Sequence, residues 1–580
     1  MSYTAADIDR IKLIVGMEVH VELATRTKMF SRAPSPACPE FDPHDNASVT
    51  PNTLIDATVL ALPGALPVMN KAAVDMAIKV GLALNCQIAP LTKWDRKSYF
   101  YPDLPKAYQI SQYDLPICFD GSIDVPAVDD KGQVDLESEP TRIGILRAHL
   151  EEDAGKLLHE APGGGAIDGS IADYNRAGTP LLEIVTQPEF TSSAQVVSFC
   201  KQLRNICRFL GVTEGIMQRG HMRFEPNINL QITMKDGKFI KTPIVEVKNL
   251  NSFKSVQAAI EYEFQEQPRR YFAERREMGP GTKQTRGWDD RAEGGRGATV
   301  LQREKEDAHD YRYFPDPDLV PVVVNDEWKE RIRATIPELP LARFARFMDE
   351  FALGKKEAAA LIDERDVCLF YERTFAAMES LGLGHARAGK LAANILLQSG
   401  AKRANEQHVE IHQLGISPEQ VASIGKLRED GKLNNQNADE LFGLLCKEFH
   451  HGDHREHGER QGSKSDSKSD SESNAGSNPF PHSSPSSSVL AVSSVVSPSS
   501  VFSSVEALAQ SRNMLTVRDD AVMSKWVDQA IAENAQAAAD VKAGKLAAVG
   551  RLVGAAMKHS GGSGDAKTLR EAILARLSAG

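Results

Sequence analysis

The stretch GMEVHVEL, residues 16–23, alternates polar and apolar side chains along its length. On a β-strand, successive side chains point to opposite faces of the sheet, so this pattern predicts a strand with one apolar and one charged face. Glu18, His20 and Glu22 would share the charged face. A solvent-exposed strand face would also explain these charges, without any chemistry. The rest of the chain must decide between the two interpretations.

Other patterns divide the first 300 residues into strands and one clear helix. The segment SSAQVVSFCKQLRNICRFLG (192–211) has the period of an amphipathic helix that ends at Gly211. Strands follow one another more often than they alternate with helices, so we expect an α+β fold around a largely antiparallel sheet. The strand-like runs are RIGILRAHLEE (142–152), PLLEIVTQ (180–187), NINLQITM (227–234) and PIVEVKNL (243–250).

The character of the chain changes near residue 326, which predicts three domains. Residues 1–325 form the first, sheet-containing domain, and residues 326–412 have a helical pattern rich in Ala, Leu, Arg and Glu. Residues 413–580 contain short helices broken by glycines. Within this last domain, 19 of the 45 residues at 461–505 are serines. Such a segment buries too little apolar surface to offset its ordering entropy, so we expect a disordered insertion at about 450–507.

Composition and charge narrow the functional classes. The net charge of −11 argues against a protein that coats nucleic acid non-specifically, although residues 510–580 carry ten Lys/Arg against seven Asp/Glu. The chain has no run of about 18 apolar residues, so we expect no membrane span. The opening MSYTAADIDR has no signal or transit character, and the seven cysteines form no CxxC pair. We therefore expect reduced thiols and a cytoplasmic protein.

Two further segments place acidic side chains in apolar surroundings. They are RAHLEEDAGK (147–156) and DYNRAGTPLLEIV (173–185), where Glu183 stands among Leu, Ile and Val. A buried carboxylate needs a cation or a donor, which either a nearby arginine or a metal ion would supply. Together with Glu18 and His20, these acids form an oxygen-rich set with one imidazole. Such a set suits Mg²⁺ or Mn²⁺ better than zinc.

A divalent cation beside carboxylates, Lys and Arg is the equipment of phosphoryl transfer. The glycine-rich stretch APGGGAIDG (161–169) lacks the GK[ST] ending of a Walker loop and predicts a flexible hairpin instead. The segment KWDRKSYFYPDLPKAYQISQYDLPI (93–117) interleaves cations with aromatic rings. That composition suits nucleotide stacking and phosphate binding, and it equally suits a packed aromatic core.

Nine motifs in sequence order carry a resemblance to a known family. They are GMEVHVEL, KMF, PGALPVMN, DRKSYFYPDLPKAYQISQ, LEEDAGK, DYNRAGTPLLEIV, EVKNLNSF, QTRGWDD and DYRYFPDPDL. Together they resemble the B-subunit (GatB/GatE) family of the aspartyl/glutamyl-tRNA(Asn/Gln) amidotransferases. The resemblance runs from about residue 13 to the C-terminus, outside the serine-rich insertion. So many long motifs in one order make the resemblance specific.

The resemblance implies a ligase that uses ATP and Mg²⁺ to phosphorylate the side-chain carboxylate of Glu-tRNA(Gln), Asp-tRNA(Asn) or both. Ammonia, released from glutamine by a partner amidase (A) subunit, then displaces phosphate to give Gln-tRNA(Gln) or Asn-tRNA(Asn). A small C subunit completes a heterotrimer. The implied fold has a cradle-shaped catalytic domain, a helical linker domain and a small helical, YqeY-like tail domain that binds tRNA.

The resemblance also implies the metal ligands. By motif, His20, Glu152 and Glu183 match the family's Mg²⁺ site, and Glu18 matches a carboxylate beside a second cation. Glu225, in MRFEPN, stands where the family usually has Asp, and is expected at the second metal position. Its neighbours Phe and Pro depart from the family pattern, so the geometry there is the least determined.

Other matched residues concern catalysis and the nucleotide. Lys97 and Glu152 are the expected catalytic residues, with Lys97 where the ammonia tunnel meets the pocket. Asn175 and Arg176 are expected to shape the nucleotide pocket.

The sequence departs from the family pattern at its zinc-binding cysteines, and it leaves two alternative functions open. Many family members hold zinc with a CxC pair and a CxxC pair. Here the second pair would fall at Asp56 and Val59, and Cys38 alone cannot hold the ion, so we expect no zinc. The alternatives are the archaeal E-type subunit, which acts on Glu-tRNA(Gln) and carries an extra folded domain, and a tRNA-binding scaffold without catalysis.

Overall fold

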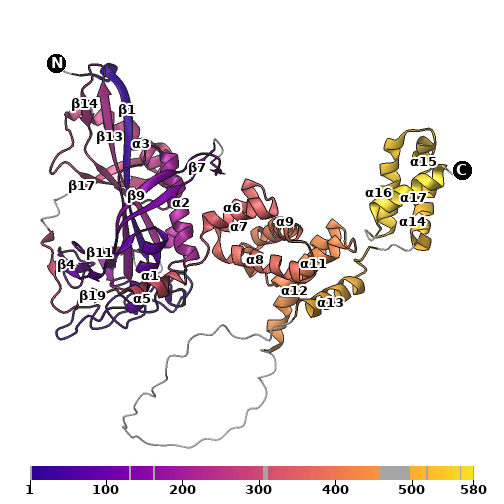
Figure 1. Ribbon diagram of the computed structural model, residues 1–580, viewed down its shortest axis with the longest axis horizontal. Helices are drawn as coiled ribbons and strands as arrows, with labels where there is room; N and C mark the ends of the chain where they lie inside the picture. Colours follow the sequence, from indigo (N-terminus) through magenta and orange to yellow (C-terminus); the bar gives the residue numbers. More distant parts are fainter. Residues whose placement is uncertain are drawn as a thin grey trace, which may run out of the picture. The chain divides into compact units, whose positions relative to one another are not determined.

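The structure is a computed structural model that describes residues 3–129, 132–160, 164–304, 311–456, 497–516, 520–561 and 564–578. The chain divides into two compact units, residues 1–345 and residues 346–580. The first unit holds a large sheet with helices packed on it, and the described part of the second is helical (Figure 1).

The first unit is built on a ten-stranded sheet with the order β17–β16–β15–β13–β1–β12–β9–β6–β2, and β14 pairs with β13. Its strand pairs are antiparallel except for β15 with β16. The predicted α+β class with a largely antiparallel sheet is therefore confirmed. The strands are β1 (Ile8–Glu22), β2 (Gln87–Ile88), β6 (Cys118–Val125), β9 (Thr141–Glu152), β12 (Pro180–Thr186), β13 (Met222–Met234), β14 (Phe239–Lys241), β15 (Val245–Lys248), β16 (Gln284–Asp289) and β17 (Ala298–Glu304).

Short sheets flank the large one. The predicted glycine-rich hairpin joins β10 to β11, although residues 161–163 at its tip lie outside the described residues. The short strands are β10 (Lys156–Glu160) with β11 (Ala166–Asp173), β18 (Phe314–Pro315) with β4 (Asp95–Ser98) and β5 (Tyr108–Ser111), β19 (Val322–Val323) with β3 (Leu91–Thr92), and β7 (Ala127–Val128) with β8 (Val134–Asp135).

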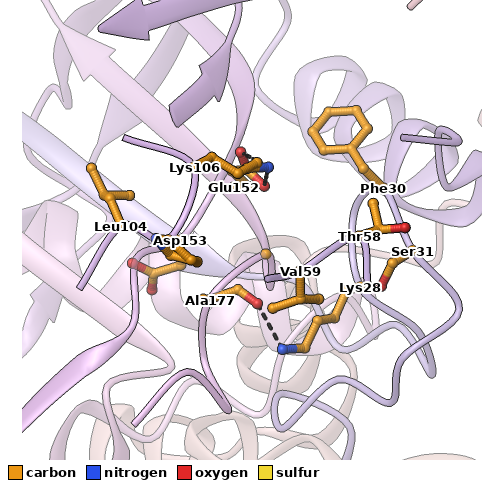
Figure 2. Close-up of a pocket in the computed structure, with 12 residues that line it drawn as sticks. Lys28, Phe30, Ser31, Thr58, Val59, Leu104, Lys106, Glu152, Asp153 and Ala177 are labelled. Atoms are coloured by element: carbon orange, nitrogen blue, oxygen red, sulfur yellow. Dashed lines mark hydrogen bonds and ion pairs between the residues drawn. The ribbon is translucent and has the colours of Figure 1, made fainter. Parts of the chain in front are cut away.

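A buried lysine anchors the loop that follows β1. Lys28 is fully buried, and its Nζ donates a hydrogen bond to the carbonyl oxygen of Ala177 at 2.6 Å (Figure 2). A second bond of 3.3 Å goes to the carbonyl oxygen of Tyr174. Lys106 and Glu152 line the same small pocket and contact each other. These contacts tie the loop to the segment that leads into β12.

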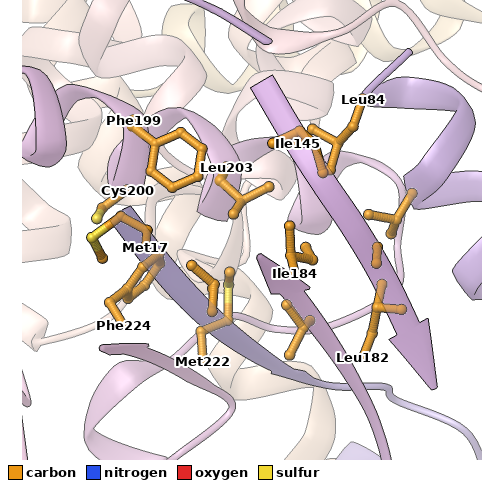
Figure 3. Close-up of a cluster of buried hydrophobic side chains, with 14 of the residues drawn as sticks. Met17, Leu84, Ile145, Leu182, Ile184, Phe199, Cys200, Leu203, Met222 and Phe224 are labelled. Atoms are coloured by element: carbon orange, nitrogen blue, oxygen red, sulfur yellow. The ribbon is translucent and has the colours of Figure 1, made fainter. Parts of the chain in front are cut away.

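The apolar face of β1 forms the main core. Its odd-numbered residues from 15 to 21 are at most 1% exposed, as the alternating pattern predicts. Phe199 and Leu203 of α2 lie against Met17 of β1 and Phe224 of β13 (Figure 3). Each fully buried side chain of this size contributes about 1.5–3 kcal/mol. The helices of the first unit are α1 (Lys71–Ala83), α2 (Ser193–Phe209), α3 (Phe253–Glu274), α4 (Ala292–Gly295), α5 (Asp326–Arg333) and α6 (Pro340–Phe351), which crosses into the second unit.

The boundaries of α2 follow from its own sequence. The Ser192 side chain accepts a hydrogen bond from the backbone N–H of Gln195 at 3.2 Å and caps the first turn. Gly211, with φ of +71°, follows the last turn in a left-handed conformation that glycine adopts without strain. The helix predicted at 192–211 is confirmed.

Helix α5 belongs to the first unit by its packing. The Trp328 indole N–H donates to Asp75 of α1 at 2.5 Å, and Lys71 lies 4.6 Å from the centre of the same ring. The two compact units divide at residue 345, whereas a change of domain was expected at 326. The helical pattern that begins at 326 therefore starts on a helix that packs against the sheet domain.

The described part of the second unit is helical, with α-helices from 7 residues (α10) to 22 residues (α12) long. Helix α13 occupies part of the expected disordered insertion, so that boundary was wrong. Ser497 caps this helix, and its apolar residues Val505 and Ala509 are buried at a spacing of four. Residues 457–496 of the insertion lie outside the described residues. The helices are α7 (Lys355–Asp363), α8 (Arg365–Ser380), α9 (His385–Ile395), α10 (Ala401–Gln407), α11 (Pro418–Glu429), α12 (Asn435–Glu456), α13 (Pro498–Ser511), α14 (Asp520–Glu533), α15 (Ala535–Lys542), α16 (Val549–His559) and α17 (Ala566–Ser578).

Helices α14 to α17 enclose a small core of their own, which is made of Ala, Val, Leu, Ile and Met side chains. Among the described helices, none combines the length and the apolar character that crossing a bilayer requires.

Candidate functional site

The charged face of β1 lies on the side of the sheet opposite the core. In the strand register, His20 stands between Glu183 of β12 and Arg223 of β13, and Glu183 pairs with His149 of β9. Residues directly opposite on neighbouring strands share a face, so these four form a row across four strands. The side chains of His20 and Glu183 are only 12% and 11% exposed. These side chains are therefore largely buried, which excludes the interpretation of this face as an ordinary solvent-exposed strand face.

Three carboxylates surround the His20 imidazole. From His20 Nε2, the distances are 3.5 Å to Glu183 Oε2, 3.8 Å to Glu18 Oε1 and 3.9 Å to Glu151 Oε1. We call these four residues the carboxylate centre. In the predicted set, Glu18, His20 and Glu183 are therefore brought together from two strands. Glu151, from a third strand, completes the group.

The electrostatics show an excess of negative charge. Burial acts to lower the pKa of His20, but the hydrogen bond to Glu183 and the charges of Glu225 and Glu183 outweigh it and raise the pKa to about 9. The pKa of Glu151 is raised to about 7, mainly by burial and then by the charge of Glu183. Burial and Glu183 also raise the pKa of Glu18. Such a group would be stabilised by a cation.

Glu225 extends the centre along the sheet. It stands opposite Glu18 in the register, and ligand atoms of Glu18, His20 and Glu225 lie within 4.8 Å of one another. Lys248 contacts Glu225 and also Glu246, the latter at 2.9 Å. Burial acts to raise the pKa of Glu225, but the charge of Lys248 outweighs it and lowers the pKa. Glu225 thus lies where a second cation position was expected, already paired with a lysine.

Glu152 was expected in the metal site, and that assignment was wrong. Its Oε1 accepts a hydrogen bond from the backbone N–H of Ile110 at 2.9 Å, and its carboxylate contacts Lys106 (Figure 2). Consecutive strand residues point to opposite faces, so Glu151 and Glu152 cannot both face His20. Glu151 is the residue that does so.

Lys97, the other expected catalytic residue, lies beside the centre. It is on β4, and its pKa is raised because the charges of Glu151 and Glu183 outweigh the effect of burial. Its Nζ lies 5.3 Å and 5.9 Å from the ring centres of Tyr311 and Tyr99. The protonated lysine therefore adds positive charge beside the carboxylate centre.

Asn175 and Arg176 mostly bind the protein's own loops. The Asn175 amide accepts from the backbone N–H of Leu54 at 2.8 Å and donates to the carbonyl oxygen of Thr50 at 2.7 Å. Arg176 donates to the carbonyl oxygens of Ala154 and Gly155 at 3.0 Å and 2.8 Å. Both residues line a cavity next to the carboxylate centre rather than the centre itself.

Two large cavities adjoin at this face of the sheet. One, of about 890 Å³, is lined by the four residues of the carboxylate centre, Lys97 and the exposed rings of Phe100 and Tyr101. The other, of about 650 Å³, contains Asn175 and Arg176. The walls of both include Arg223 and Glu225. The first cavity is large enough for a nucleotide or a comparable polar ligand.

Sequence reasoning missed several residues of this site. His149, Glu151 and Asp153 alternate in RAHLEED just as Glu18 and His20 alternate in MEVHVE. Applying the same period of two to β9 would have selected Glu151. Arg223 was missed too, although it alternates with Glu225 on β13.

The fold and the site together define a class. It is an α+β protein whose largely antiparallel sheet carries a buried set of carboxylates and one imidazole, donor types that suit a divalent cation, beside a large cavity. Comparison with known protein families identifies the family of this chain. The GatB/GatE catalytic domain matches residues 13–330, and the GatB domain matches residues 381–470 and 499–577. The chain belongs to the GatB/GatE family, which confirms the resemblance carried by its motifs.

Similar curated proteins are each named as the B subunit of an aspartyl/glutamyl-tRNA(Asn/Gln) amidotransferase. The protein from Rhodopirellula baltica is 37% identical over 550 residues, which cover 95% of this chain and 94% of the relative. That from Thermobifida fusca is 39% identical over 572 residues, covering 97% and 93%. That from Caldanaerobacter subterraneus is 34% identical over 569 residues, covering 98% and 100%.

Proposed function

We propose that this chain is the carboxylate-activating subunit of a tRNA-dependent amidotransferase. It uses ATP to phosphorylate the side-chain carboxylate of Glu-tRNA(Gln), Asp-tRNA(Asn) or both, and ammonia then converts the activated group to the amide. The names of its relatives support the overall reaction. The observation that carries the activation step is the convergence of three carboxylates on His20 within 3.9 Å, on the wall of a large cavity.

The carboxylate centre has the donors that Mg²⁺ requires. Glu18, Glu151 and Glu183 offer oxygens and His20 one nitrogen, and Glu225 would serve a second ion. The bound ion would neutralise charge on the phosphate oxygens. The raised pKa of His20 supports this role, because it reflects the negative charge of Glu183 and Glu225. The pKa values of Glu18 and Glu151 are raised first by burial and then by Glu183, so a bound cation would favour their charged forms.

The chain's own side chains would orient the reactants. A carboxylate oxygen of the aminoacyl group attacks the γ-phosphorus of ATP, and ADP leaves with the electrons of the broken bond. Lys97, which stays protonated beside Glu151, would hold a transferring phosphate oxygen. The nitrogen of ammonia then attacks the acyl carbon, phosphate leaves with the electrons of the broken C–O bond, and the nitrogen loses one proton to give the amide.

The proposal includes partners and a compartment. An amidase A subunit would release the ammonia and a small C subunit would complete a heterotrimer, in the cytoplasm. Co-expression of this chain with candidate A and C subunits tests it directly. Conversion of mischarged Glu-tRNA(Gln) or Asp-tRNA(Asn), with ATP and glutamine supplied, is the expected result. Absence of product with both tRNAs and a properly assembled complex would contradict the proposal.

One variant distinguishes the enzyme from the alternative function, a tRNA-binding scaffold without catalysis. In the His20→Ala complex we expect loss of phosphorylated aminoacyl-tRNA while tRNA binding persists. A scaffold would show no difference between the variant and the wild type.

The tail helices are proposed to bind tRNA. Deleting residues 510–580 should leave ATP hydrolysis in place and weaken tRNA binding in a salt-dependent way, because the segment carries a surplus of basic residues. Unchanged tRNA affinity after the deletion would refute this role.

A further inference from the structure

A second group of metal-binding side chains lies away from the carboxylate centre. Asp42, Glu214 and His221 come from three separate segments, and one ligand atom of each lies within 4.8 Å of the others. Asp42 follows the short helix Pro39–Phe41, Glu214 follows α2, and His221 immediately precedes β13. We call these three residues the Asp42 cluster. Asp42 and His221 both line the cavity of about 650 Å³.

The imidazole of His221 is the feature that points to a ligand. The residue is 4% exposed, and its Nε2 is directed at Asp42 Oδ2 over 3.5 Å. Its Nδ1 is buried and has no hydrogen-bond partner among the described residues. Three other described imidazoles, of His20, His149 and His412, also have an unpartnered buried Nδ1. Of these four residues, His20 and His221 are the ones that lie in groups of possible metal ligands.

Arg219 holds the Asp42 carboxylate from one side. It donates to Asp42 Oδ2 at 2.9 Å and, with both terminal nitrogens, to the Asp45 carboxylate. An outer cation or donor that orients a carboxylate ligand is a common companion of protein metal sites. A purely structural ion pair would account for Arg219, Asp42 and Asp45. It would use Nε2 of His221, which faces Asp42, and would leave the buried Nδ1 without a partner.

We propose that Asp42, Glu214 and His221 bind a divalent transition-metal ion, with Zn²⁺ as the best-matched ion. One imidazole nitrogen and two carboxylate oxygens suit zinc, and three protein ligands leave a position for water. The cluster contains no cysteine, so it differs from the cysteine-held zinc for which this chain lacks ligands. The ion would fasten the segment around Asp42 to the start of β13, and so shape one wall of the cavity. This inference does not depend on the proposed function.

Metal content of the full-length chain tests the proposal. The chain is loaded with Zn²⁺ in the presence of excess Mg²⁺, dialysed, and its zinc is measured by mass spectrometry. We expect the wild type to retain one more zinc per chain than Glu214→Gln and His221→Asn. Glu214 is only partly buried, so Glu214→Gln remains informative if the buried His221→Asn variant fails to fold. Co²⁺ absorption provides affinities, which should fall at least about tenfold in Glu214→Gln.

Two controls make the outcome decisive. Glu40→Gln changes an exposed carboxylate that is paired with Arg26, and His159→Asn changes an exposed imidazole that is bonded to Ser170. Both should keep the zinc, and so should His20→Ala in the carboxylate centre. Equal zinc content and Co²⁺ affinity in wild type and Glu214→Gln would overturn the proposal. Loss of the zinc in His20→Ala but not in Glu214→Gln would assign the ion to the carboxylate centre and would overturn it as well.

Discussion

Two buried charged regions of the first unit meet at adjacent residues of one strand. Glu151 belongs to the carboxylate centre, where ligand atoms of Glu151, Glu183 and His20 lie within 4.8 Å of one another. Two like charges at about that distance repel by about 3–4 kcal/mol at an effective dielectric constant near 20. Glu183 and Glu225 raise the pKa of His20 to about 9 against the effect of burial, which favours the protonated imidazole.

Glu152 belongs to the second region, the lysine pocket, which we define as Lys28, Lys106 and Glu152. Here Glu152 meets a lysine and a backbone N–H, and Lys28 donates to two backbone carbonyls. The Glu152 carboxylate is therefore paired inside the chain, and Lys28, whose charged form burial disfavours, is held by backbone carbonyls. A set of charges that the protein balances by itself is typical of structure, whereas an unbalanced set indicates a site for an external ion.

The largest expected effect on activity comes from removing a charge in the carboxylate centre. We expect Glu151→Gln to lower kcat/KM for amide formation by about 10²–10³-fold, because a missing metal ligand removes several kcal/mol of charge stabilisation. The unfolding midpoint should change little. Steady-state kinetics of the assembled complex, with mischarged tRNA, measures the loss. Activity within threefold of the wild type would remove Glu151 from the centre.

In the lysine pocket, by contrast, removing a charge should lower the stability of the protein. Glu152→Gln leaves Lys106 buried without its carboxylate, so we expect the free energy of unfolding to fall by about 3 kcal/mol. Urea unfolding followed by tryptophan fluorescence reports on this unit, since Trp94 and Trp288 lie in its core. The double variant Glu152→Gln with Lys106→Met should lose less than the single one. An equal loss in both would show that the pair is not coupled.

The pH dependence of stability isolates Lys28. Burial lowers the pKa of Lys28 to about 7 from an ordinary 10.5. Between these values the unfolded chain binds the extra proton, so stability is lost as pH falls from 10.5 towards 7 and is regained as pH rises. From pH 7.5 to 9.5 we expect wild type to gain about 2–3 kcal/mol relative to Lys28→Met. The exposed Lys241→Met is the matched control, and it should show no such gain.

The smallest expected effect concerns Glu225. The substitution Glu225→Asp keeps the charge that Lys248 contacts, so we expect less than about a fivefold change in kcat/KM, near 1 kcal/mol. A loss as large as that of Glu151→Gln would place Glu225 inside the carboxylate centre rather than beside it.

Much of the fold could be predicted from the sequence because it depends on local periodicity. The alternation in residues 16–23 gave a strand with Met17 in the core and His20 on the other face, and the helix at 192–211 followed from its period and its capping serine. Such a pattern specifies the face of each side chain strongly. A shift of the strand by one residue would turn its charged side chains into the core.

The site was predictable only where such a pattern was applied. Glu18, His20 and Glu183 were identified from strand-like segments, and Lys97 from its motif. The choice of Glu152 over Glu151 ignored the period of two on β9, and the structure corrects it. Helix α13 was missed because its serines resemble the preceding segment, while its few apolar residues find partners in the second unit.

The sequence by itself determined which side chains face the core and which face away, because that depends on backbone geometry within one strand or helix. Which charged residues meet across strands was decided by the tertiary structure alone. His20, Glu151 and Glu183 lie up to 163 residues apart in the chain, and the members of the Asp42 cluster are separated on a similar scale. Sheet order and register bring them together, and neither can be read from local periodicity, because pairing between distant strands is a property of the whole fold.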